Sequence, residues 1–173
     1  MSQPARQLDD DEKYPKNVIG LSIWFPLLCA AVVAVAFLLF RRLVPQEWAL
    51  HVDGYGNVTY GSWWWLFVGV LVIAGLSFLL GQYLARDFSN LGHWYPQQKS
   101  IVVICFTVGY GVLGFLIVNM ISAWNIFENS EPPGVEDLMG YGLLGFVLAT
   151  TISATLYAKL LPKAKSLAQA KQY

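Results

Sequence analysis

His51 and Asp53 are the residues of this sequence whose types and spacing most resemble a reactive pair. An imidazole next to a carboxylate can act as a general base or bind a metal ion, and residues two apart on a strand share one face. A metal site, however, needs three or four protein ligands. The two cysteines, Cys29 and Cys105, lie inside apolar runs, where a thiol behaves as a small hydrophobic group. We therefore expect no catalytic residues, no metal site, no cofactor and no enzymatic activity.

Recognition is the alternative use of the same stretch. Aromatic side chains next to a polar pair suit a peptide, a lipid headgroup or a partner protein, and this interpretation selects Trp48, His51, Asp53 and Tyr55 as contact residues. The competing interpretation is structural. In it, the Asp53 side chain caps a turn, and His51 bonds to the loop backbone or to neighbouring headgroups. The sequence leaves both interpretations open.

The residues around this pair have the pattern of a short β-hairpin. Trp48, Leu50 and Val52 alternate with Ala49 and His51, turn-forming residues occupy 53–57, and β-prone residues follow over 58–60. A two-stranded hairpin alone is marginal in water, so we expect it to rest on neighbouring helix ends. Trp63, Trp64 and Trp65 come next, and we expect them to be interfacial anchors in an aromatic belt.

Four long apolar runs surround this loop and must position it. Of the 173 residues, 56% are hydrophobic and only 13% are charged, about half the charge of a typical soluble domain. Uncharged runs cover 18–40, 62–85, 100–127 and 138–158, and each has the roughly 20 residues that a helix needs to cross a membrane. The first run exceeds a signal peptide's apolar region and is followed by two arginines, so we expect it to be a permanent span. The sequence predicts an all-α membrane protein, a four-helix transmembrane domain over 18–158 with a short external β-hairpin between the first two helices.

Lysine and arginine residues are unevenly distributed around these runs, and their distribution predicts the orientation. Two of them, Arg41 and Arg42, lie in the first loop. The other nine lie in 1–17, 86–99 and 159–173: Arg6, Lys13, Lys16, Arg86, Lys99, Lys159, Lys163, Lys165 and Lys171. We therefore expect a multi-pass protein of the cell membrane with both termini cytoplasmic and with loops 41–61 and 128–137 outside. His93 would then lie across the membrane from His51 and cannot share a metal ion with it.

The two terminal segments and the loop over 128–137 lie outside the apolar runs. Residues 1–17 are polar and are predicted to be a disordered cytoplasmic tail. Residues 159–173 have spaced lysines, which predict a basic, lipid-facing tail, with partner docking as the alternative. The zero net charge and the lack of a basic run exclude nucleic-acid binding. The four acidic residues of 128–137 fit no calcium-loop spacing, so a solvated turn is favoured there over a cation site.

Small and weakly polar residues are the notable features within the runs, which contain no ionisable carboxylate, amine or imidazole. That lack argues against an ion-coupled transporter acting alone. Small residues let helices approach closely, so we expect helix packing at Gly109, Gly111, Gly114, Asn119, Gly142, Gly145 and Thr151. The alternative is a groove for a solute lined by Asn119 and Thr151. A homo-oligomer or a complex with another membrane protein is also compatible with this sequence.

Pro45, Trp48-Ala49, His51 and Gly56 carry a family resemblance. Their spacing resembles the LP-x-x-(V/I)-(A/P)-x-H-x-x-x-x-G signature that follows the first membrane helix in a bacterial membrane family of unknown function. The same module forms the N-terminal part of SdpI-type immunity proteins, which protect a bacterium from its own secreted peptide toxin. The expected function is therefore non-enzymatic recognition of a peptide, a lipid or a partner subunit through the external loop, with a transporter component for a small hydrophobic solute as the alternative.

Overall fold

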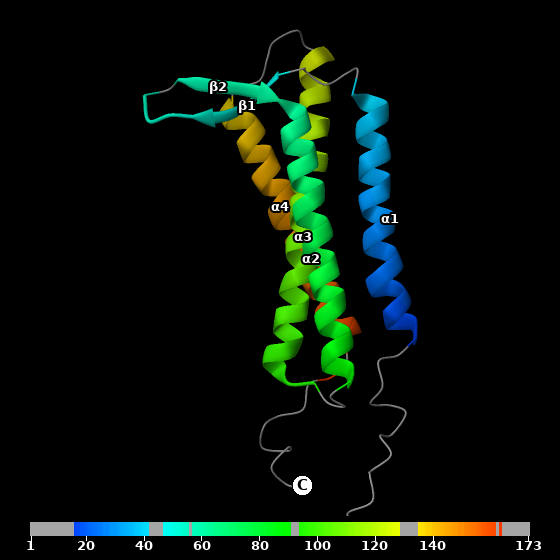
Figure 1. Cartoon of the computed structure of the whole chain (residues 1–173). Coiled ribbons are helices and arrows are strands. Elements are labelled where there is room, and N and C mark those ends of the chain that lie inside the picture. Colours follow the sequence, from blue (N-terminus) through cyan, green and yellow to red (C-terminus); the bar gives the residue numbers. More distant parts are fainter. Residues whose placement is uncertain are drawn as a thin grey trace, which may run out of the picture.

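The protein is a bundle of four helices with a β-hairpin at one end (Figure 1). The computed structural model describes residues 16–41, 47–55, 57–90, 94–128, 135–161 and 163. The elements are, in order, α1 (Lys16–Phe40), β1 (Glu47–Val52), β2 (Val58–Ser62), α2 (Trp63–Asn90), α3 (Pro96–Glu128) and α4 (Val135–Leu160). Most of both predicted tails, most of loop 128–137, Pro45 and Gly56 lie outside the described residues.

Each helix extends beyond the uncharged run that predicted it. The runs end at the first charged residue, whereas α2 continues through Arg86 and Asp87, and α3 begins before Lys99. Backbone hydrogen bonding does not stop where hydrophobicity stops, because polar side chains are tolerated in a helix at headgroup depth. The sequence therefore predicted the number and type of the elements better than their ends.

Three of the helices are long and apolar enough to cross a membrane. These are the segments Trp63–Phe88, Pro96–Ser122 and Gly140–Leu160, and α1 contributes a shorter apolar helix, Trp24–Phe40. Large apolar side chains are exposed along every helix: Leu39 is 72% exposed, Leu76 63% and Ile152 67%. A surface of this kind suits lipid rather than water. The multi-pass architecture follows from the three long helices, and a crossing by α1 stays a prediction.

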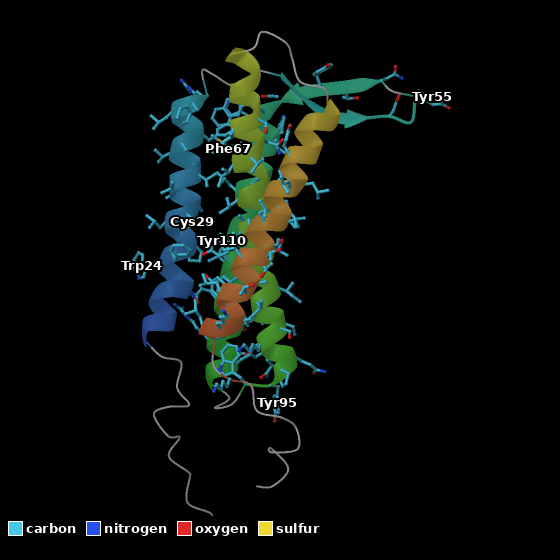
Figure 2. The ribbon with its side chains drawn as sticks, turned by 180° about the vertical axis from the view of Figure 1, so that it is seen from behind. Trp24, Cys29, Tyr55, Phe67, Tyr95 and Tyr110 are labelled. Carbon is cyan, nitrogen blue, oxygen red and sulfur yellow. The ribbon has the colours of Figure 1, made fainter. Side chains whose placement is uncertain are left out.

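The most extensive helix contact joins α3 and α4, and glycines make it possible. A Cβ atom added to Gly114 would lie 2.6 Å from the carbonyl oxygen of Gly145, and one added to Gly145 would lie 2.5 Å from the carbonyl oxygen of Gly114. Real Cβ atoms essentially never approach other atoms this closely. The two backbones therefore touch where α4 crosses α3 (Figure 2), as expected for membrane helices that pack through small residues.

Helix α1 lies at one side of the bundle and packs against α2 and α3 (Figure 1). Phe37 of α1 is only 1% exposed, and Val33 and Pro26 of α1 are buried as well. The Phe37 ring stacks on Phe67 at 4.1 Å between centroids and lies 4.5 Å from the Trp63 ring. Elsewhere α1 exposes much of its surface, including Trp24 at 72% and Leu28 at 61%. The aromatic contacts of Phe37, together with the buried Val33 and Pro26, thus connect α1 to the other helices.

The hairpin pairs β1 and β2 in antiparallel register, with Glu47 opposite Ser62 and Val52 opposite Val58. The register shifts between Ala49 and His51, so Leu50 is an extra residue on β1. Such a bulge interrupts strict alternation and increases the twist, which the regular pattern read over 48–52 did not predict. Strand β2 ends at Ser62 and α2 begins at Trp63, so the hairpin joins the bundle without a linker.

Candidate functional site

The turn of the hairpin is held together by Asp53. Its Oδ1 accepts hydrogen bonds from the backbone N–H groups of Tyr55 (2.9 Å) and Asn57 (2.8 Å), and its Oδ2 accepts one from Nδ2 of Asn57 (2.7 Å). The Asp53 backbone N–H donates to the Asn57 carbonyl at 3.0 Å. This is the turn-capping arrangement that the structural interpretation of Asp53 predicted. The carboxylate therefore fixes the shape of the hairpin tip.

Tyr55 lies at the hairpin tip and is almost fully exposed. It is 95% exposed and points away from the helices (Figure 2). Tyr60 on β2 is also well exposed, at 60%. A tyrosine offers a rigid apolar ring and a hydrogen-bonding hydroxyl, a combination common at binding surfaces. The tip thus presents aromatic surface on a turn whose geometry is fixed.

For the other two predicted contact residues, His51 and Trp48, the structure gives the backbone position in the hairpin. His51 lies on β1 opposite Thr59 of β2, and Trp48 lies opposite Gly61. The structure therefore places all four predicted contact residues in one hairpin, with Asp53 and Tyr55 at its tip. Among the residues that the structure describes, no three His, Cys, Asp or Glu side chains are close enough together to hold a metal ion.

The three consecutive tryptophans do not form a uniform belt. Trp63 is only 7% exposed and packs on Phe37, whereas Trp64 is 43% exposed and Trp65 is 76% exposed. Successive helical residues point about 100° apart, so three in a row cannot share one face. Trp63 therefore joins α1 to α2, and the role of the three tryptophans as interfacial anchors stays a prediction. The Ser62 hydroxyl accepts a hydrogen bond from the Trp64 backbone N–H at 3.4 Å, at the N-terminus of α2.

Most of the small residues singled out in the sequence lie at helix contacts. Gly109 faces the Phe78 ring of α2, Gly111 faces Thr150 and Phe146 of α4, and Gly142 faces Asn119. Asn119 itself is 3% exposed, and its Nδ2 donates to the Phe115 carbonyl at 2.9 Å. A Cβ atom added at any of these three glycines would collide with a side chain of the neighbouring helix.

Thr151 departs from this pattern. It is exposed, and its hydroxyl donates to the Val147 carbonyl of its own helix at 2.8 Å. The neighbouring Thr150 is the residue whose methyl group faces Gly111, because one residue along a helix turns the side chain by about 100°. Thr151 therefore makes no helix contact of the kind that Thr150 makes, and its packing role stays a prediction. Of the two residues suggested for a solute groove, Asn119 is buried and Thr151 is exposed.

The structure contains a polar pair that the sequence reading missed. The hydroxyl groups of Tyr110 on α3 and Tyr157 on α4 lie 3.2 Å apart, within hydrogen-bond distance. Tyr157 is 1% exposed and stacks on Phe106 at 4.4 Å between centroids. The Tyr110 ring lies 5.0 Å from Phe78 of α2 and 6.1 Å from Phe25 of α1. Side chains from all four helices thus meet around this pair, near the level of Cys29 (Figure 2).

The signal for this pair was weak, because a tyrosine in an apolar run counts as one more hydrophobic residue. Buried tyrosine hydroxyls normally find a hydrogen-bond partner, and here each supplies the other's. Thr107 lies one turn before Tyr110, and its buried hydroxyl has no hydrogen-bond partner within the described part of the chain. The interior of the bundle is therefore more polar than its composition indicated.

Comparisons with known proteins give weak similarities to membrane proteins. No protein-family model and no solved structure matches the chain. The chain is 30% identical over 111 residues to a phospho-N-acetylmuramoyl-pentapeptide-transferase of Levilactobacillus brevis, covering 58% of this chain and 34% of that protein. It is 33% identical over 119 residues to a protein of Bdellovibrio bacteriovorus named "Probable lipid II flippase MurJ", covering 66% of this chain and 21% of that protein. It is 29% identical over 115 residues to protein rexB of Escherichia phage lambda, covering 64% of this chain and 78% of that protein.

These three proteins have three different names, and the chain spans about a third and a fifth of the lengths of the first two. What the first two share with this chain is their membrane character. Together with the three long apolar helices, the similarities identify a helical, multi-pass membrane protein.

Proposed function

We propose that this protein is a non-enzymatic recognition protein of the cell membrane, and that its hairpin binds a peptide at the outer membrane surface. The observation that carries the proposal is a two-stranded sheet, held out from the bundle, with a tip of fixed shape (Figure 1). Neither outer edge of this sheet is paired with a further strand in the described part of the chain. Unpaired edges present backbone N–H and C=O groups to which an extended peptide can add as another strand.

The exposed aromatic rings favour a peptide over a small solute. Main-chain pairing along a strand edge supplies affinity, and side chains beside the edge supply specificity. Tyr55 and Tyr60 project from the same hairpin, and Asp53 fixes the turn between the strands. A turn that is already ordered loses less conformational entropy when a ligand binds.

The outward placement of the hairpin, with α1 as a fourth span, belongs to the same proposal. Arg86 of α2, Lys99 of α3 and Lys159 of α4 lie toward the ends of their helices away from the hairpin (Figure 1). Positive residues favour the cytoplasmic side, which supports an external hairpin and cytoplasmic termini. The resemblance of Pro45, His51 and Gly56 to the SdpI-type module makes immunity to a secreted peptide toxin one example of such recognition.

Site-specific photo-crosslinking in intact cells tests the proposal. A photoreactive residue replaces Tyr55 at the tip or, as the matched control, Tyr83, which is also exposed (67%) but lies on α2 away from the hairpin. We expect a peptide or protein adduct from position 55 that is absent from position 83. The same adduct should be lost when Asp53→Ala is introduced beside the probe at position 55.

Three outcomes would contradict the proposal. Equal adducts at both positions would mean that the hairpin has no preference. Adducts at position 55 that contain only lipid would mean that the hairpin contacts the membrane and not a peptide. An adduct that persists with Asp53→Ala would show that the ordered turn is not needed.

A further inference from the structure

A basic groove lies at the end of the bundle away from the hairpin. It has a volume of about 740 Å³ and runs between the start of α3 and the end of α4, where its lining includes Lys99, Ser100, Val103, Ile104 and Lys163. Two side chains of the lining are cationic and none is acidic. The apolar part of the lining continues along α3 from the charged part. The groove is therefore amphipathic, with its charge at the helix ends and its apolar wall toward the middle of the span.

The position of Lys99 in this groove is fixed by the fold. Its Nζ donates a hydrogen bond to the Leu161 carbonyl at 3.1 Å, just beyond the last residue of α4. An ammonium group has three donors, so two remain for a ligand. The bond satisfies a carbonyl at the negative end of the α4 dipole, while the positive end of α3 lies three residues from Lys99 at Pro96. Lys163 is exposed and adds a second positive charge.

The groove lies where two of the long apolar segments end, which is where a spanning helix would reach the lipid headgroups. The spanning segments begin at Pro96 and end at Leu160, so the residues beside them mark the boundary of the apolar layer. Ile104, one turn beyond Ser100, is 59% exposed and belongs to the lipid-facing surface. A ligand in this groove would have its charged group beside the two lysines and its chain along Val103 and Ile104. An anionic phospholipid has this shape and charge, and basic pockets between membrane helices are typical sites for anionic headgroups.

We infer that this groove is a binding site for one anionic phospholipid, whose phosphate lies between Lys99 and Lys163. The site is separate from the hairpin and uses the opposite end of the bundle. It binds a resident lipid rather than a ligand that arrives from solution. The outcome of a lipid-binding test at this groove is therefore independent of peptide recognition by the hairpin.

The test uses the full-length chain in nanodiscs that contain phosphatidylglycerol and phosphatidylcholine, with the retained lipids counted by native mass spectrometry. The unmodified protein should retain one phosphatidylglycerol in preference to phosphatidylcholine. Lys163→Gln should weaken that retention roughly fivefold, the factor that corresponds to about 1 kcal/mol per lysine near a membrane surface. Lys163 is exposed, so its substitution should leave folding unchanged.

Arg86→Gln is the matched control, because it removes one positive charge from an exposed residue of α2 that does not line the groove. We expect it to retain phosphatidylglycerol like the unmodified protein. Lys99→Gln with Lys163→Gln should weaken retention by about 25-fold if the two lysines act independently. Equal retention by the Lys163 and Arg86 variants would overturn the inference, as would equal retention of the two lipids. Displacement of the lipid by millimolar inorganic phosphate would also overturn it, since the acyl chain would then contribute nothing.

Discussion

The Asp53 side chain alone holds much of the hairpin turn in place. Three hydrogen bonds within the tip converge on its two carboxylate oxygens. Bonds from neutral donors to an ionised acceptor are worth more than neutral pairs. The pairing of β1 and β2 thus depends partly on a residue that belongs to neither strand.

Asp53→Ala is therefore expected to loosen the tip without unfolding the bundle. The backbone amides of Tyr55 and Asn57 lose their acceptor, so their hydrogen exchange should accelerate by about tenfold, given roughly 1.5 kcal/mol for bonds to a charged group. Hydrogen–deuterium exchange measured by mass spectrometry checks this. Asn57→Ala removes only the 2.7 Å side-chain bond and should have a smaller effect. Equal exchange in both variants would mean that Asp53 is not the cap of the turn.

The tyrosine pair leads to a second prediction at the residue scale. Tyr157→Phe removes one hydroxyl and leaves the Tyr110 hydroxyl without this partner. We expect a loss of about 1 kcal/mol in the free energy of unfolding. The double variant with Tyr110→Phe should lose less than the sum of the two single losses, because no hydroxyl is then left unsatisfied. Reversible unfolding in detergent measures all three variants, and strictly additive losses would rule out coupling.

At the scale of elements, the contact between α3 and α4 depends on the lack of side chains at Gly114 and Gly145. Gly145→Ala would place a methyl group against the Gly114 carbonyl oxygen. Overpacking of this kind costs about 1–3 kcal/mol, which exceeds the roughly 1 kcal/mol that alanine gains over glycine in a helix. We expect a net loss of stability.

Gly140→Ala is the control for this element, because no atom lies within 4 Å of its added Cβ. It should leave stability unchanged or raise it. Thermal unfolding of the two variants in the same detergent compares them directly. A Gly145 variant as stable as the Gly140 variant would show that the two helices can separate at no cost.

The sequence predicted the helices and the hairpin better than the contacts between them. Long uncharged runs identified the helices, and turn residues at 53–57 identified the hairpin, because both signals are local. The bulge at Leu50 has no local signal, since it depends on how the two strands pair. The burial of Trp63 was not predicted, because it depends on Phe37, which lies on a different helix. The tyrosine pair was missed for the same reason, as its partners are 47 residues apart.

At the scale of the whole molecule, α1 is the least firmly attached helix. Phe37 is its large buried aromatic residue, and it packs against Trp63 and Phe67. Phe37→Ala is expected to loosen α1, with a loss of about 3 kcal/mol or more from an aromatic core residue. Cys29 should then react faster with a thiol reagent that partitions into lipid. Leu39→Ala, on the exposed side of α1 at 72%, should leave that rate unchanged, and equal rates in both variants would place the attachment of α1 elsewhere.

Orientation is a property of the whole molecule as well. With the termini cytoplasmic, a cysteine at Tyr55 should react with a membrane-impermeant maleimide in intact cells, and a cysteine at Lys163 should react only after the cells are opened. Both positions are exposed, so a difference in labelling reports sidedness and not burial. The reverse pattern would contradict the orientation predicted from the positive charges.

The junction of β2 and α2, where no residue intervenes, has a consequence for the order of assembly. Because strand and helix are continuous, insertion of α2 into the bilayer fixes one strand of the hairpin at the surface. The other strand follows α1 in the chain and is made earlier, so it needs only to fold back across a short turn. Contacts α2·α3 and α3·α4 likewise join neighbours in sequence. Each element thus meets its partner soon after synthesis, and the chain can assemble from its N-terminal end while it is still being made.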